Sequence, residues 1–143
     1  MFLLLLPPLI YGAIIDYRKR EIPNIVPLLI CGIGIIDSAD CPEVLLRRFV
    51  VAAIILGSYM VVSGVEGMAR MGGGDIKLMA AMTIALGVFA TAIVVFFTGL
   101  AAVVVSVIKY RGISKLKEAD IPMCTFVLPA YVLTYTIAIL LPK

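Results

Sequence analysis

The sequence predicts an all-α fold: a polytopic membrane helical bundle of about six transmembrane helices. Of the 143 residues, 63% are hydrophobic and only 15% are charged, whereas a soluble domain is about 25% charged. The apolar runs are much longer than the alternating segments of about 10 residues that build membrane barrels. Helices satisfy their own backbone hydrogen bonds in lipid. The length fits one domain, covering residues 1–143.

The first two predicted spans flank a short polar segment. Met1–Ile15 is apolar, but a span usually needs about 20 residues, so we expect this helix to extend to Arg18–Arg20. The long basic side chains there can snorkel to the interface. The basic cluster follows the apolar run instead of preceding it, which argues against a secretory signal peptide. The second run starts at Ile22-Pro23-Asn24 and ends near Ile36.

Two further runs each make one predicted span. The third run covers Val44–Val65 and follows a short acidic loop. The last run covers Ile121–Leu141 and contains Pro122 and Pro129, which can bend a helix.

The run Ile76–Ile108 is too long for one span. Its 33 residues would make a helix of about 50 Å, against an apolar membrane core of about 30 Å. Gly87 and Thr91 near its middle allow a tight hairpin between two short spans. With six spans and the N-terminus outside, nine of the twelve Lys and Arg residues lie inside. A single span here would leave only five of them inside, so the excess of basic residues inside favours six spans.

This topology brings two carboxylates to the same membrane face. Asp16 ends the first span on the inside, and Asp75 begins the fourth span on the same side, directly after Gly72-Gly73-Gly74. A carboxylate at the edge of a membrane span is a functional candidate. The alternative for Asp75 is a helix N-cap, and for Asp16 a membrane-edge charge paired with Arg18 or Arg20.

Two aspartates at one depth can perform general acid–base hydrolysis. If they approach closely, both do not ionise easily and the pair holds one proton. One member can then activate water while the other donates a proton to a carbonyl oxygen. The glycines would let an extended substrate backbone lie close to Asp75. A helix beginning at Asp75 would favour its ionised form, which suits the base.

Composition argues against several other kinds of site. The chain has no histidine, and its three cysteines show no Cys-x-x-Cys spacing, so we expect neither a metal site nor a cofactor. Cys31 and Cys124 lie in apolar runs and are interpreted as small hydrophobic residues. The basic residues cluster in loops, where they indicate topology, so we expect the lipid bilayer and not nucleic acid as partner.

The motifs resemble the prepilin peptidase family of GxGD aspartyl proteases. Asp16 precedes Ile22-Pro23-Asn24 by six residues, and Gly72-Gly73-Gly74-Asp75-Ile76-Lys77-Leu78 follows later. The resemblance covers nearly the whole chain. It implies that Asp16 and Asp75 are the catalytic pair, with the glycines, Lys77 and Ile22-Pro23-Asn24 as motif or substrate-binding residues.

The resemblance also implies a substrate and a location. Family members remove a short basic leader, followed by an apolar helix, from type IV pilin-like precursors at the cytoplasmic face of the cell membrane. The small size is similar to the peptidases of Tad/Flp pilus systems and to small archaeal relatives. Large bacterial members carry an additional segment with paired cysteines and methylate the new N-terminus. We therefore expect no methyltransferase activity.

Two other functions use the same features. A small proton- or cation-coupled transporter could use the two acids as a titrating relay, although both are predicted at one face and not at the bilayer midplane. A non-catalytic membrane scaffold for pilus assembly is the other alternative. The presence of both acids favours the peptidase.

Overall fold

The computed structural model describes residues 2–19, 21–63, 73–110 and 123–140, and this part of the chain is helical without strands. The predicted all-α class and the six predicted helices are confirmed within these ranges. In chain order the helices are α1 (Phe2–Lys19), α2 (Ile25–Asp37), α3 (Pro42–Ser63), α4 (Gly73–Leu86), α5 (Val88–Tyr110) and α6 (Met123–Leu140).

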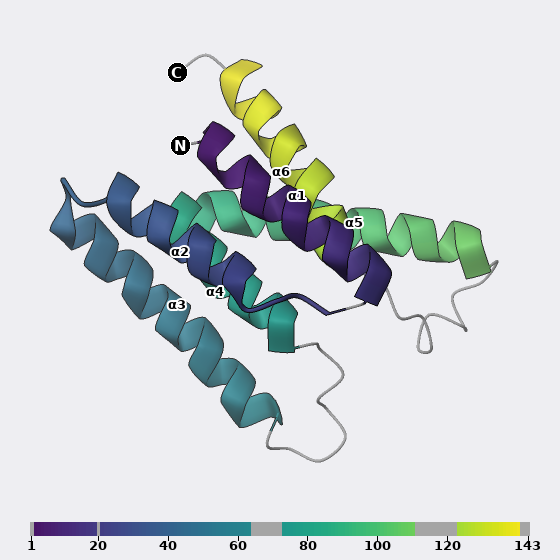
Figure 1. The fold of residues 1–143 in the computed structure, drawn as a ribbon, viewed down its shortest axis with the longest axis horizontal. Helices are drawn as coiled ribbons and strands as arrows, with labels where there is room; N and C mark the ends of the chain where they lie inside the picture. Colours follow the sequence, from purple (N-terminus) through teal and green to yellow (C-terminus); the bar gives the residue numbers. More distant parts are fainter. Residues whose placement is uncertain (1, 20, 64–72, 111–122, 141–143) are drawn as a thin grey trace.

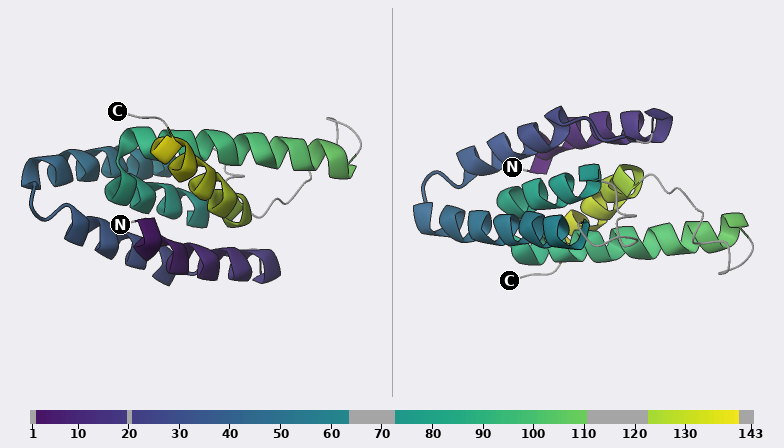
Figure 2. Two further views of the ribbon diagram at one scale, coloured as in Figure 1. Left: turned by 90° about the horizontal axis from the view of Figure 1, so that it is seen from above. Right: turned by 90° about the horizontal axis from the view of Figure 1, so that it is seen from below.

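The helices form three layers, with α4 and α6 in the middle (Figures 1 and 2). One outer layer holds α1 and α2, and the other holds α3 and α5. In contact terms, α4 packs on α2, α3 and α5, while α6 packs on α1 and α5. The two middle helices are therefore covered from both sides.

α4 is the most enclosed helix of the bundle. Most of its residues are buried, and among its described positions no large apolar side chain is exposed. Leu78, Met82 and Ala85 belong to the main apolar core, together with side chains from α1, α2, α5 and α6. A smaller cluster joins Ala80 and Ile84 to α3. The packed core from Leu78 onward thus fixes the helix whose first turn begins at Gly73.

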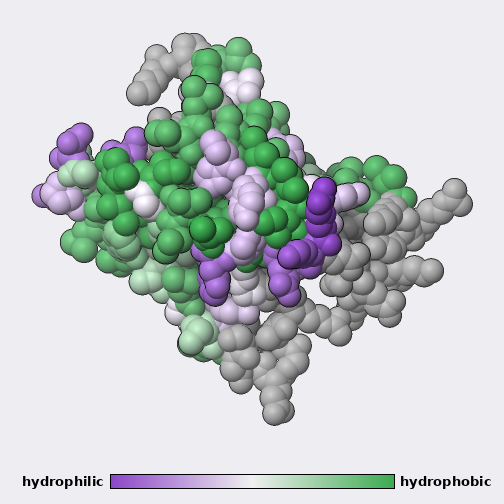
Figure 3. Space-filling model, in the orientation of Figure 1, coloured by the Kyte–Doolittle hydropathy of each residue, from purple (hydrophilic) through white to green (hydrophobic). Residues whose placement is uncertain are grey.

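The outer surface of the bundle is mostly apolar. Large exposed hydrophobic side chains occur on α1, α2, α3, α5 and α6. Hydrophobic residues cover much of the described face in Figure 3, and strongly hydrophilic ones gather at its left edge and toward its lower centre. Among the described residues, α3 and α5 contain stretches long and apolar enough to cross a membrane, Pro42–Val61 and Val88–Val105. Such a surface suits contact with lipid better than contact with water.

Three helices begin at positions that differ from the sequence prediction, and one of them is α4, which begins at Gly73 and not at Asp75. α2 begins at Ile25, and residues 22–24 precede it as a separate segment. The Pro23 carbonyl of this segment accepts a hydrogen bond of 3.0 Å from the Val26 N–H in the first turn of α2. α3 begins at Pro42 and not at Val44. Proline is favoured at the first helical position, where its missing N–H has no intrahelical partner.

The long apolar run is divided at Gly87, as predicted, but into unequal helices. Gly87 has a φ of 85°, a conformation that glycine adopts without steric cost, and it separates α4 from α5. α4 has 14 residues and spans about 21 Å, while α5 has 23 and spans about 35 Å. The prediction of two short spans was therefore wrong for α5, which extends to Tyr110.

Candidate active site

Asp16 lies in the last turn of α1 and points into the bundle. Its side chain is only 4% exposed, whereas the neighbouring Arg18 is exposed. Its Oδ2 accepts a hydrogen bond of 2.8 Å from the backbone N–H of Cys124, and the Thr125 N–H also donates to this carboxylate. These amides belong to the first turn of α6, where N–H groups have no intrahelical acceptor. The alternative interpretation of Asp16 as a membrane-edge charge paired with Arg18 does not fit a buried carboxylate with backbone donors, and Arg20 lies outside the described residues.

A glycine one turn earlier on α1 lets the start of α6 come this close. Gly12 and Asp16 lie four residues apart and share a helix face. A Cβ atom on Gly12 would lie 3.1 Å from the Cys124 Sγ and 3.1 Å from a Val26 methyl group. The same residue, Cys124, therefore packs its side chain against Gly12 and gives its N–H to Asp16.

Asp75 lies in the first turn of α4, at the third helical residue. It is half-buried; the buried Ile76 follows it directly, and the buried Leu78 lies three residues after it. The described helix starts at Gly73, so Asp75 is inside the first turn and is not the N-cap residue that the alternative interpretation required.

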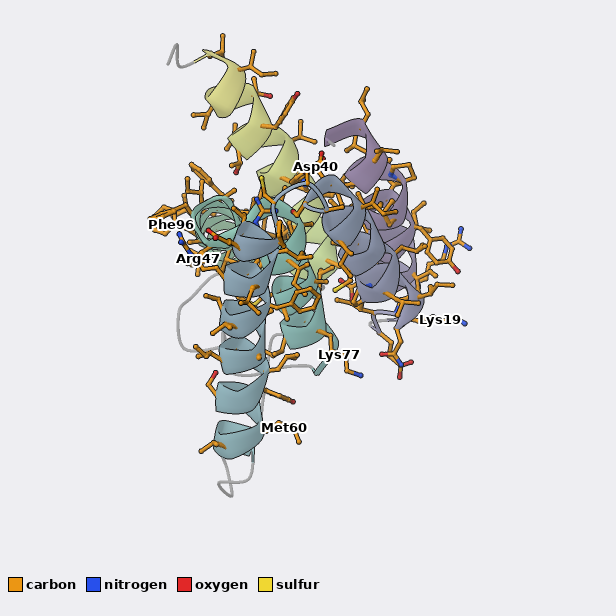
Figure 4. All side chains as sticks on the ribbon, turned by 90° about the vertical axis from the view of Figure 1, so that its left-hand side faces the viewer. Lys19, Asp40, Arg47, Met60, Lys77 and Phe96 are labelled. Atoms are coloured by element: carbon orange, nitrogen blue, oxygen red, sulfur yellow. The ribbon has the colours of Figure 1, made fainter. Side chains whose placement is uncertain are left out.

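The structure brings Asp16 and Asp75 together. Their charges are close enough to interact, and the buried Cys124 thiol lies within the electrostatic influence of both. Lys19 of α1 and Lys77 of α4 lie toward one end of the bundle, while Asp40 and Arg47 lie toward the other (Figure 4). Two neighbouring carboxylates that are buried or half-buried share a proton readily, so this arrangement can supply both an acid and a base.

The segment Ile22-Pro23-Asn24 lies against the first turns of α4. Lys77 donates a hydrogen bond of 3.0 Å from its Nζ to the Asn24 Oδ1. A Cβ atom on Gly74 would lie 3.1 Å from the Ile22 Cβ, so glycine allows this close contact. Ile22 is partly buried against the main core. The two sequence motifs are thus in direct contact on both sides of Asp75.

The glycines before Asp75 have different surroundings. Gly74 faces Ile22, as described, while a Cβ atom on Gly73 would lie 3.6 Å from the Tyr59 hydroxyl of α3. Gly72 lies outside the described residues. The expected role of these glycines in admitting a substrate backbone stays a prediction.

Sequence reasoning missed two features of this site: the backbone donors at the start of α6 and the position of Cys124 beside the two acids. The amides of Cys124 and Thr125 are backbone groups, and no side-chain pattern marks them. Cys124 was interpreted only as a small apolar residue. The available signal was Pro122, because a helix that begins shortly after a proline presents free N–H groups at the same predicted membrane face as Asp16.

The described residues contain no group of three or more His, Cys, Asp or Glu side chains arranged to hold a metal ion.

A comparison with protein families matches residues 3–107 to the type IV leader peptidase family. Comparisons with curated proteins and with solved structures returned no significant match. The matched segment contains Asp16, Asp75 and both motifs that lie beside them, and it covers most of the chain. The chain therefore belongs to the type IV leader peptidase family.

Proposed function

We propose that this protein is a membrane aspartic endopeptidase that removes the short basic leader from type IV pilin-like precursors, of the Flp/Tad type. The observation that carries the proposal is the enclosed pair of Asp16 and Asp75, contributed by two helices and close enough to interact. Membership of a leader peptidase family gives the reaction class. The pair provides a base for water and an acid for the scissile carbonyl.

The proposed topology has six spans, an outside N-terminus and both aspartates at the cytoplasmic face of the cell membrane. It is supported by the location of Lys19 and Lys77 at one end of the bundle and of Asp40 at the other (Figure 4). A substrate with a basic leader and an apolar helix would then present its cleavage site at the level of the pair. Its helix would remain in lipid beside the apolar outer surface of the bundle.

The test is co-expression with a small pilin precursor, followed by N-terminal sequencing of the membrane-bound product. We expect Asp16→Asn and Asp75→Asn each to lower the cleavage rate by about 10³-fold, because each removes one half of acid–base catalysis. Asp40→Asn is the matched control, since Asp40 is exposed and lies at the opposite end of the bundle. Near-normal processing by either active-pair variant would contradict the mechanism.

A further inference from the structure

We infer that Asp16 is the ionised member and general base of the pair, and that Asp75 carries the shared proton and is the general acid. This inference rests on the proposed peptidase function and adds the distribution of roles between the two acids. It reverses the assignment that the sequence favoured, in which a helix beginning at Asp75 made that residue the base.

The start of α6 supplies the asymmetry. Asp16 accepts backbone hydrogen bonds from both Cys124 and Thr125, and the first of these measures 2.8 Å. Donors aimed at a carboxylate favour its charged form, and the positive end of the α6 dipole acts in the same direction. Because Asp16 is only 4% exposed, water does little to weaken these hydrogen bonds, which oppose the cost of burying its charge.

Asp75 receives no such backbone hydrogen bonds among the described residues. Burial and the mutual repulsion of the two charges act on both acids, so they favour one neutral carboxyl group in the pair without deciding which one it is. Asp75 lies at the positive end of α4, whereas Asp16 lies between the positive end of α6 and the negative end of α1, so the helix dipoles do not favour Asp16. The two α6 amides that donate to Asp16 carry the asymmetry. On the described elements, the titratable groups close to Asp16 are Asp75 and the Cys124 thiol.

These roles give a balanced reaction. Asp16 takes one proton from water while the water oxygen bonds to the scissile carbonyl carbon, and Asp75 gives its proton to the carbonyl oxygen. The resulting gem-diol collapses when Asp16 passes its proton to the leaving nitrogen and one diol proton returns to Asp75. The C–N bond breaks, and both side chains regain their starting states.

The first experiment measures the two carboxyl groups directly by carbon-13 NMR of protein labelled at aspartate Cγ. The other three aspartates, Asp37, Asp40 and Asp120, are replaced by asparagine. At mildly acidic pH, where the pair holds one proton, we expect the signal correlated with the Cys124 N–H to have a carboxylate shift and the other signal a carboxylic acid shift. The reverse pattern, two carboxylates or two acids would each overturn the inference. Leader cleavage by the same sample decides the peptidase function separately.

The second experiment removes a single amide donor. Cys124→Pro deletes the N–H that reaches Asp16, and proline is tolerated in the first turn of a helix. Cys124→Ala keeps the N–H and is the matched control for loss of the thiol. We expect kcat to fall about 10-fold or more in the proline variant, with KM unchanged, because a hydrogen bond to a charged group is lost. Equal kcat values for the two variants would show that this amide does not support the base.

Discussion

The two ends of α4 differ. Its C-terminal end packs closely against Gly34 of α2 and binds the Arg48 side chain, whereas its N-terminal end carries the Asp75 carboxyl group close to that of Asp16. The Arg48 Nη1 donates to the Ile84 and Ala85 carbonyls at 3.2 and 3.1 Å, and to the Ser38 Oγ at 2.8 Å. These carbonyls belong to the last turn, where no intrahelical donor exists. The positive charge also complements the negative end of the helix.

The difference separates stability from function along one short helix. The C-terminal end satisfies its polar groups and packs closely, so substitutions there should destabilise the bundle. The N-terminal end keeps two acids near each other, an arrangement that is unfavourable for folding and useful for catalysis. Substitutions at the C-terminal end should therefore lower mainly the unfolding free energy, and substitutions at the N-terminal end should lower mainly the activity.

The largest expected loss of stability is at the contact between α2 and α4. A Cβ atom on Gly34 would lie 2.5 Å from the Ala85 Cα and 2.8 Å from its N, and backbone atoms do not move aside easily. We expect Gly34→Ala to lower the unfolding free energy by about 3 kcal/mol, the upper part of the range for overpacking. Denaturant titration in mild detergent micelles measures it.

A control for this substitution lies on the same helix. Gly32 has no atom within 4 Å of the position of an added Cβ, so Gly32→Ala should leave stability unchanged or slightly raised. If both alanine variants lost the same stability, the loss would come from α2 itself and not from its contact with α4.

The next largest effect concerns Arg48. Arg48→Met keeps much of the side-chain length but removes the donors to two carbonyls and to Ser38, so we expect a loss of about 2 kcal/mol. The neighbouring Arg47 is exposed, and Arg47→Met is the matched control. Activity per folded molecule should stay near normal, because Arg48 of α3 contacts the C-terminal end of α4, away from Asp75. A specific loss of kcat without loss of stability would contradict this division.

At the N-terminal end of α4 we expect a substitution to raise the unfolding free energy, not to lower it. Asp75→Asn has nearly the same shape but removes a half-buried carboxyl group that faces Asp16. We expect the unfolding free energy at neutral pH to rise by about 1 kcal/mol while leader cleavage is lost. Asp40→Asn, at an exposed position, should change neither quantity. A clear destabilisation by Asp75→Asn would mean that the carboxyl group has a structural role.

Much of the helical plan follows from local features of the sequence. Apolar runs give the six helices, and Gly87 marks a real break because a positive φ suits glycine. Charge asymmetry predicted Asp16 and Asp75 at one membrane face; that placement stays a prediction, while in the structure the two charges are close enough to interact. These inferences depend on periodicity, length and charge, which are properties of the chain itself.

The remaining features depend on how helices meet. Gly12 and Gly34 look like ordinary glycines in apolar runs, and only packing shows that Cys124 and Ala85 occupy the space beside them. The backbone donors to Asp16 are likewise absent from any side-chain motif. Lys77 was expected near the acids, but its partner Asn24 is 53 residues away in sequence and follows from tertiary structure alone.

The smallest expected effect is on that contact between Lys77 and Asn24. The hydrogen bond is exposed, so its coupling energy in a double-mutant cycle of Lys77→Met with Asn24→Ala should be only about 0.5 kcal/mol. The contact ties the segment 22–24 to the turn that carries Asp75, so kcat should fall a few-fold. A cycle of Asn24→Ala with Lys19→Met, which changes an exposed lysine at the same end of the bundle, should show no coupling. Coupling of equal size in both cycles would indicate a general charge effect at this end and not a specific link between the two motifs.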